Sequence, residues 1–217
     1  MKVLVFIISH CFDPQWKPNM VILRDYMQSI DGEVEYCAIS SQNDFVAYND
    51  VIPYKYTVVN PLCQIRKLHD FVGKYHPCLQ YDWFIKTRPD IKMLEPLRFD
   101  WLNPNAINAR ARVYKGPKAI PYGMSVNGPH DIFSNIKDSV AKEALETEVV
   151  LDDQFFVFSH KVVAAGAFRP VIVLPNVCSN EWVQSDIFKA RNIPLNVIGM
   201  QLELTKHKTF SGHLNCN

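Results

Sequence analysis

The stretch from Tyr81 to Ile91 constrains the fold more than any other part of this 217-residue chain. It begins as an aromatic and aliphatic run typical of a β-strand and ends in Thr-Arg-Pro-Asp, where proline cannot donate to a strand ladder. Because side chains two residues apart share a face of an extended chain, we expect Arg88 and Asp90 to point the same way. A cation and a carboxylate then emerge together at the carboxyl end of a buried strand, where ligands bind in open α/β sheets. A surface ion pair that follows a core strand is the alternative interpretation.

The segments before this stretch alternate between strand and helix patterns. Residues 2–8 form a continuous apolar run of the kind that is covered on both faces of a sheet. A helical pattern follows, with its apolar stripe between Val21 and Ile30, and then a strand pattern over residues 33–39. Asn60-Pro61 begins a second helix, with its apolar stripe between Ile65 and Val72. The order strand, helix, strand, helix, strand predicts a parallel, right-handed α/β arrangement.

The second half of the chain mixes strand, helix and loop patterns. Residues 115–124 are rich in proline and glycine and predict a long, shaped loop, a type of segment that is often functional. We find no internal repeat, low-complexity tract or interdomain linker. The other predicted elements are strands at residues 106–113, 171–174 and 197–204, and helices at residues 132–136, 138–148 and 180–191.

Several polar side chains follow the predicted strands and are candidates for ligand contacts. Ser9 and His10 come directly after the first strand, and Ser40 begins the polar cluster after the second. Arg66 and Lys67 lie early in the second helix, where the macrodipole disfavours cations, so they indicate a site for phosphate groups. The alternatives are a packed or capping histidine, an ordinary polar loop and a solvated helix face.

Two adjacent carboxylates, Asp152 and Asp153, interrupt the apolar run at residues 149–158. Burying them is unfavourable unless a partner compensates the charge. We expect one of them to cap the following segment and the other to face the ligand crevice as a general base.

Composition excludes several classes of protein. A formal net charge of +1, with no run of Lys or Arg, argues against a nucleic-acid or anionic-membrane partner. No apolar run is long enough to span a bilayer, and the amino terminus lacks a signal-peptide pattern, so we expect an intracellular, cytoplasmic protein. Six scattered cysteines without a Cys-x-x-Cys pair predict free thiols. The chain also lacks a Gly-rich phosphate loop, so a metal on Asp90 together with cationic side chains is the predicted means of neutralising a diphosphate.

One local sequence resembles that of a known family. It is Asp82-Trp83-Phe84-Ile85-Lys86-Thr87-Arg88-Pro89-Asp90, preceded by Asn60 and Gln64-Ile65. It is similar to the nucleotide-sugar half of GT-A glycosyltransferases of the polysaccharide and capsular type. In these, R-x-D stands where other members carry D-x-D. The chain length and the Met1 start also resemble the small GT-A domain of chlorovirus transferases that glycosylate a capsid protein, which implies a viral protein in a host cytoplasm.

This resemblance implies a single α/β domain with a central, mostly parallel mixed sheet flanked by helices. Residues 1–100 are then the nucleotide-sugar-binding half and residues 101–217 the acceptor-binding half. The implied reaction moves a sugar from a UDP-sugar to a glycan or glycoprotein acceptor with inversion. The implied roles are donor base and ribose contacts by Ser9, His10 and Ser40, phosphate contacts by Arg88 with Arg66 or Lys67, and proton abstraction by Asp152 or Asp153. A Mn²⁺ or Mg²⁺ ion on Asp90 completes the set, with His207 or His213 of the basic tail as further ligands.

Two other functions remain open from the sequence. The first is a binding module that holds a nucleotide or glycan without turnover, in which Arg88 and Asp90 form a salt bridge and the two aspartates are caps. The second is a nucleotidyltransferase, a class that clusters several carboxylates around two metals. The lone Asp90 argues against that class.

Overall fold

The computed structural model describes residues 1–75, 80–115, 147–169 and 180–205. The predicted α/β class and the alternation of strands and helices are confirmed in these ranges. The strands are β1 (Lys2–Ile8), β2 (Glu33–Ser40), β3 (Tyr54–Val59), β4 (Trp83–Thr87), β5 (Ile91–Met93), β6 (Ile107–Lys115), β7 (Thr147–Ser159), β8 (Leu195–Val197) and β9 (Leu202–Leu204). The α-helices are α1 (Lys17–Gln28), α2 (Gln64–Tyr75), α4 (His160–Ala164) and α5 (Asn180–Ala190).

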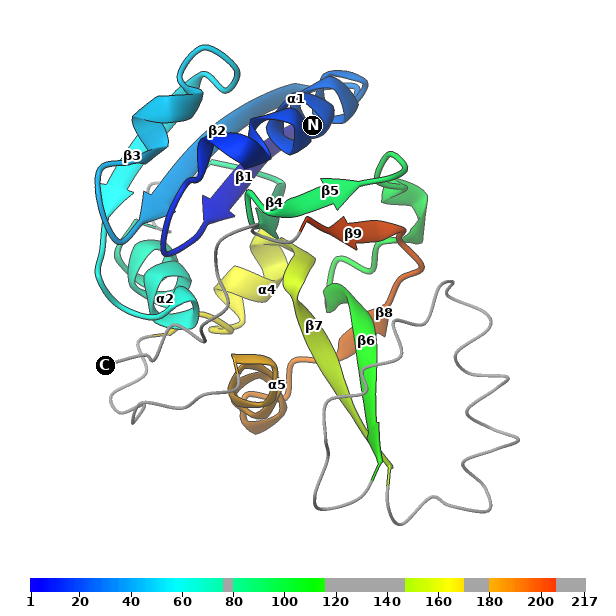
Figure 1. Cartoon of the computed structure of the whole chain (residues 1–217). Helices are drawn as coiled ribbons and strands as arrows, with labels where there is room; N and C mark the ends of the chain where they lie inside the picture. Colours follow the sequence, from blue (N-terminus) through cyan, green and yellow to red (C-terminus); the bar gives the residue numbers. More distant parts are fainter. Residues whose placement is uncertain (76–79, 116–146, 170–179, 206–217) are drawn as a thin grey trace.

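The strands form one large mixed sheet in the order β3-β2-β1-β4-β7-β6-β8, beside a small sheet of β5 and β9. β3, β2, β1 and β4 run parallel to one another. β7 runs antiparallel to both β4 and β6, and β8 runs parallel to β6. Figure 1 shows β6 and β7 side by side as a long ribbon that projects from the body of the sheet.

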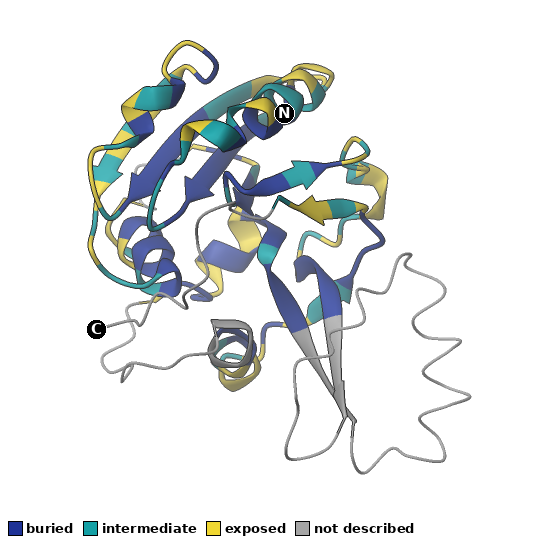
Figure 2. Ribbon diagram, in the orientation of Figure 1, coloured by how far each residue is buried: buried dark blue, intermediate teal, exposed yellow. Residues whose placement is uncertain are grey.

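Helices cover both faces of the sheet, and β1 shows why. Val3, Val5 and Ile7 pack into one core cluster, which includes the apolar face of α1. The alternate residues Leu4 and Phe6 pack into a second cluster with α2, α4 and α5. Because both faces are covered, β1 is dark blue along its length in Figure 2 and reads as a continuous apolar run. Each fully buried side chain of this size contributes about 1.5–3 kcal/mol relative to an exposed one.

The two predicted helices before Tyr81 are present, but the buried face was predicted more accurately for α2 than for α1. In α2 the predicted stripe from Ile65 to Val72 is buried. In α1 the fully buried residues are Met20, Leu23 and Met27, spaced three and four apart. The predicted stripe between Val21 and Ile30 is half-buried and packs against the margin of the same core cluster. Both rows are apolar, so periodicity alone did not distinguish the buried row from its half-buried neighbour.

One strand was missed, and two further expectations need correction. The polar-alternating strand β3 was not predicted, because only alternate side chains of this edge strand are half-buried. The predicted strand at 197–204 is two short strands, β8 and β9, in different sheets. Residues 147–148 belong to β7 rather than to a helix at 138–148. Most of the predicted loop at 115–124, the helix at 132–136 and the strand at 171–174 lie outside the described residues.

The described helices are all too short or too polar to cross a bilayer. The division into a donor half and an acceptor half stays a prediction, because the large sheet runs from β3 across β4 and β7 to β8 without a break.

Candidate functional site

Five segments of the chain meet at one edge of the large sheet. β1, β2 and β4 are parallel, so the residues that follow them lie at the same edge. β7 is antiparallel to β4 and pairs Phe156 with Lys86, so the residues just before Phe156 lie beyond the carboxyl end of β4. The amino-terminal half of α2 reaches the same edge through Lys67, which contacts Ser9. This edge therefore gathers Ser9, His10, Ser40, Lys67, Arg88, Asp90, Asp152 and Asp153.

Arg88 and Asp90 form a bidentate ion pair at the end of β4. Arg88 Nε donates to Asp90 Oδ1 at 2.9 Å, and Arg88 Nη2 donates to Asp90 Oδ2. The predicted shared direction of the two side chains is thereby confirmed. Burial opposes the charge on Arg88, but the hydrogen bond and charge of Asp90 outweigh it and raise the pKa of Arg88. Asn19 Nδ2 donates to the Pro89 carbonyl and Thr205 N to the Asp90 carbonyl, which fixes this turn against α1 and β9.

A bulge in β7 presents the two adjacent aspartates to this edge. β6 advances only from Ala109 to Ala111 while β7 advances from Leu151 to Phe156, so Asp152 and Asp153 lie in the extra segment. Bulges of this kind redirect side chains and are common beside active sites. The two residues lie inside a strand, so the expectation that one of them caps a following segment was wrong.

The bulge gives the two aspartates different environments. Asp152 is fully buried, and its Oδ2 accepts from Arg110 Nε at 3.1 Å and from Arg110 Nη2 at 2.7 Å. Its Oδ1 accepts from the Gln154 backbone at 3.2 Å, so both oxygens of Asp152 are engaged. Asp153 is 5 % exposed, and its carboxylate forms no hydrogen bond or ion pair within the described residues. Of the two aspartates, Asp153 is therefore the one whose carboxylate has no partner among the described residues.

Lys86 lies on β4 beside Asp153 and was assigned no role from the sequence. Its side chain is buried, and Nζ donates to the Asp153 carbonyl and lies 3.4 Å from Gln64 Oε1. Burial lowers the pKa of Lys86 to about 8, although the charge of Asp153 acts in the opposite direction. A cavity of about 10 Å³, enough for one water molecule, is lined by Lys86, Asp153, Gln64, Gln184 and the apolar side chains of Ile65, Leu68 and Phe156.

Lys67 ties the ends of β1 and β2 together from α2. Its buried Nζ donates to the Ser9 carbonyl at 2.6 Å and to Ser41 Oγ at 2.8 Å. Burial lowers the pKa of Lys67 to about 8. His10 Nδ1 lies 3.3 Å from the same Ser41 hydroxyl. Burial, followed by the positive charges of Lys67 and Arg88, lowers the pKa of His10, so its ring is neutral near pH 7.

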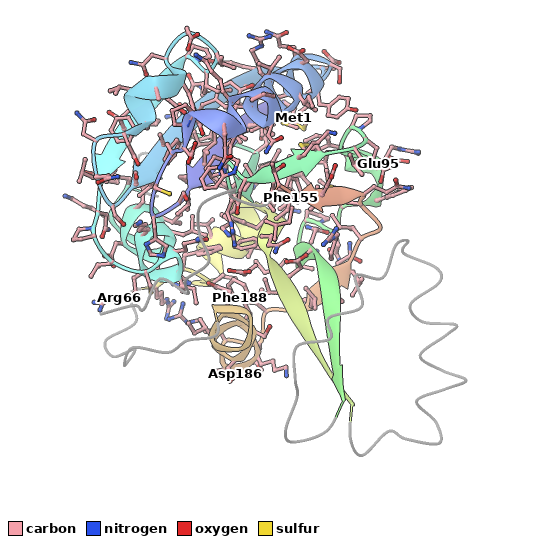
Figure 3. The ribbon with its side chains drawn as sticks, viewed as in Figure 1. Met1, Arg66, Glu95, Phe155, Asp186 and Phe188 are labelled. Atoms are coloured by element: carbon pink, nitrogen blue, oxygen red, sulfur yellow. The ribbon has the colours of Figure 1, made fainter. Side chains whose placement is uncertain are left out.

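The remaining two predicted donor contacts, Ser40 and Arg66, differ in burial and in their partners. Ser40 is fully buried, and its Oγ donates to Asp44 Oδ1 at 2.7 Å, while Asp44 also accepts from the Phe12 backbone. Arg66 is half-buried on α2 and forms no hydrogen bond or ion pair within the described residues. Figure 3 shows Arg66 directed outward from α2, away from the sheet. Donor contacts by Ser40 and Arg66 stay predictions.

Sequence reasoning missed three charged residues that hold the site together, namely Lys86, Arg110 and Asp44. A signal was present for Lys86 and Arg110, because each is a cation inside a predicted strand and a buried cation needs oxygen partners. Their partners, the Asp153 carbonyl and the Asp152 carboxylate, come from a strand more than 40 positions away in sequence. The sequence therefore showed that each buried cation needs an oxygen partner, but not which residue supplies it.

The described residues do not form a ready ligand set for a divalent ion. No three His, Cys, Asp or Glu side chains come together within the ranges that the structure describes. Both oxygens of Asp90 already contact the Arg88 guanidinium, and an ion bound there lies close to that positive charge. Two unit charges 4 Å apart repel by about 4 kcal/mol at an effective dielectric constant of 20, and a divalent ion carries twice the charge. The other predicted metal ligands, His207 and His213, lie outside the described residues.

No protein-family model matches this chain, and no curated protein matches it. Solved structures do match its fold. The chain is similar to a 4-diphosphocytidyl-2C-methyl-D-erythritol synthase, with a TM-score of 0.52 and 9% identity over 91% of this chain and 89% of the other. It is also similar to the enzyme of that name from Anaerococcus prevotii, with a TM-score of 0.54 and 11% identity over 97% and 92% of the two chains.

A galactosyltransferase, LgtC, solved with donor and acceptor sugar analogues, has a TM-score of 0.40 at 11% identity over 75% of this chain and 59% of its own. At identities this low, the two synthase structures establish the fold and nothing more. The chain is a single α/β domain of GT-A-like fold, with a mostly parallel mixed central sheet flanked by helices.

Proposed function

We propose that this chain is a glycosyltransferase that moves a sugar from a nucleoside-diphosphate sugar, most simply a UDP-sugar, to a hydroxyl of a glycan or glycoprotein acceptor. The observation that carries the proposal is that a cation and a carboxylate with no partner among the described residues lie at the same edge of the sheet. Arg88 supplies the cation, and Asp153 supplies the carboxylate. The charge of Asp153 also acts on Arg88, so the two groups lie near each other.

In the proposed reaction, the donor's base and ribose lie over the ends of β1 and β2, beside Ser9 and His10. The diphosphate accepts charge-assisted hydrogen bonds from Arg88. Asp153 removes the proton of the acceptor hydroxyl as its oxygen attacks the anomeric carbon, and the bond from that carbon to the diphosphate oxygen breaks. The nucleoside diphosphate leaves with the bonding electrons, and attack from the opposite face inverts the anomeric centre.

The experiment that tests this function measures release of nucleoside diphosphate from a panel of nucleotide sugars with glycan acceptors. Replacing Asp153 with Asn removes the base while keeping the size of the side chain. We expect kcat to fall by about 10²–10⁴-fold with little change in the unfolding temperature. Asp186→Asn, on the exposed face of α5, is the matched control with unchanged kcat. Full activity in Asp153→Asn removes the assignment of the base.

Asp152→Asn tests the structural role of the other aspartate by urea unfolding. The buried pair with Arg110 loses one charge, and removing one partner of a buried pair destabilises a protein by about 3–5 kcal/mol. We therefore expect Asp152→Asn to lower the midpoint of urea unfolding, which Asp153→Asn leaves nearly unchanged. Equal stability losses in the two variants contradict the different environments described above.

A binding module without turnover is the second candidate, and the Arg88–Asp90 pair is the observation that favours it. An ion pair is what this alternative predicted for the two residues. The two are distinguished by product: a transferase releases nucleoside diphosphate when an acceptor is present, and a binding module does not. Release of pyrophosphate from CTP or UTP with a sugar phosphate instead assigns a nucleotidyltransferase, as the names of the two synthases reported above suggest.

A further inference from the structure

We infer that the diphosphate of the donor is held by the Arg88 guanidinium itself, with no divalent ion on Asp90, and that Asp90 is a positioning residue for Arg88. This inference rests on the proposed function, because it concerns the donor of that reaction. It replaces the ion expected on Asp90 with a side-chain cation that the chain already places there.

The first step of the argument is the geometry of the pair. The Asp90 carboxylate accepts hydrogen bonds from both Nε and Nη2 of Arg88, so the guanidinium plane is fixed relative to the end of β4. A guanidinium has five N–H donors, and this pairing leaves three of them for a ligand. A planar group with free N–H donors suits the bidentate recognition of phosphate oxygens.

The second step is a comparison with an identical motif elsewhere in this chain. Arg98 and Asp100 form the same bidentate pair at the same spacing, with distances of 3.0 and 2.7 Å. Their side chains are 55% and 62% exposed, whereas those of Arg88 and Asp90 are 23% and 11% exposed. The surface pair is solvated, but the pair at the end of β4 is largely buried and interacts with the charges of Asp152 and Asp153.

The third step is the surrounding charge. Lys86 is buried close enough to Arg88 for the two charges to interact, and the charges of Lys67 and Arg88 both act on His10. Each lysine Nζ donates to neutral oxygens rather than to a carboxylate. Each ammonium has three N–H bonds and two partners within the described residues. Their positive charges are therefore available to favour an anion bound at Arg88, without contact between either lysine and that anion.

The experiment is isothermal titration calorimetry of the full chain with UDP, GDP and CDP as probes, in EDTA and in MnCl₂. We expect the dissociation constant of the best nucleotide to differ by less than about threefold between the two buffers. Arg88→Gln weakens binding in EDTA by about tenfold or more, because a charge-assisted hydrogen bond is lost. Arg88→Lys retains the charge and recovers part of the loss, and Arg98→Gln is the matched control with unchanged binding.

Asp90→Asn distinguishes a positioning residue from a metal ligand. Asn keeps one oxygen that accepts from Arg88, so we expect weaker binding in EDTA, but with a smaller loss than in Arg88→Gln. Unfolding temperatures of all four variants show that each is folded. Binding that requires MnCl₂ and disappears in Asp90→Asn overturns this inference and leaves the glycosyltransferase in place. Binding of no nucleotide in either buffer overturns both the inference and the proposed function.

Discussion

Lys86 is a charged residue at a strand position whose neighbours Phe84 and Ile85 are buried apolar side chains. Its ammonium group is separated from water, and the nearest oxygens are the Asp153 carbonyl and Gln64 Oε1. Burial of the charge lowers the pKa of Lys86 to about 8. The charged groups that act on it are Asp153 and Asp152 on β7, and Arg88 and Asp90 after β4. A lysine in this position is unfavourable for folding, which indicates that it serves the site.

Replacing Lys86 with Met tests whether the buried charge of Lys86 destabilises the folded state. Near pH 7 both the folded and the unfolded state hold the proton, so the folded state carries the full penalty of the buried charge. Above about pH 8 the folded state has lost a proton that the unfolded state keeps up to its pKa of 10.5, so wild-type stability gains as the pH rises. Relative to wild type, Lys86→Met is thus more stable near pH 7 than near pH 10, by up to about 3 kcal/mol.

Urea unfolding of both proteins across this pH range measures the difference. Lys161→Met, which changes an exposed lysine on α4, is the control, and its stability relative to wild type should not vary with pH. A stability difference for Lys86→Met that is constant with pH indicates that Lys86 ionises as an ordinary exposed lysine does.

The end of α4 illustrates how a short element is terminated. Ser159 caps its amino end by accepting from the Lys161 backbone at 3.0 Å. At the other end, Gly166 N donates to the Val163 carbonyl and Ala167 N to the Val162 carbonyl, which is the Schellman arrangement. Gly166 has a φ of 86°, a left-handed conformation that is strained for any residue with a Cβ.

Gly166→Ala is therefore expected to destabilise the protein by about 1–3 kcal/mol. A Cβ at this position also lies 2.5 Å from Arg169 Nε, so the Arg169 side chain must move. Gly73→Ala, inside α2, is the matched control and should stabilise the protein by up to about 1 kcal/mol. Denaturant unfolding measures both. A neutral Gly166→Ala contradicts the left-handed conformation.

At the scale of the whole molecule, the sheet topology decides where the site lies. Three parallel strands place their carboxyl ends at one edge, and the antiparallel β7 returns to that edge from the other half of the sheet. The core clusters on both faces join these strands to α1, α2 and α5. A ligand at this edge therefore contacts elements from both halves of the chain, and its binding energy adds to the stability of the folded domain.

UDP at about 100 times its dissociation constant should add about 2.7 kcal/mol to the free energy of unfolding. For a chain of this length, the midpoint of thermal unfolding then rises by about 5–10 °C. Uridine, which lacks the diphosphate, is the control and should give a much smaller shift. Equal shifts from uridine and UDP indicate that the nucleoside alone is recognised and that Arg88 has no role in binding.

Local patterns in the sequence were sufficient for the α/β class, for β1, β2, β4, α2 and α5, and for the shared direction of Arg88 and Asp90. Each of these depends on residues close together in the chain, where apolar periodicity and strand alternation act directly. The sequence also marked Asp152 and Asp153 as carboxylates in need of partners. It did not separate them, because the Arg110 guanidinium comes from β6, and it did not reveal the β7 bulge.

Only the tertiary structure decided which aspartate is engaged, what surrounds Lys86 and Lys67, and which row of α1 faces the sheet. In each case the deciding contact joins distant parts of the chain, as between Lys67 and Ser9 or between Lys86 and the Asp153 carbonyl. Local sequence fixes backbone preference and the pattern of burial, but the pairing of buried charges depends on strand order and register. Those are set by the packing of the whole domain.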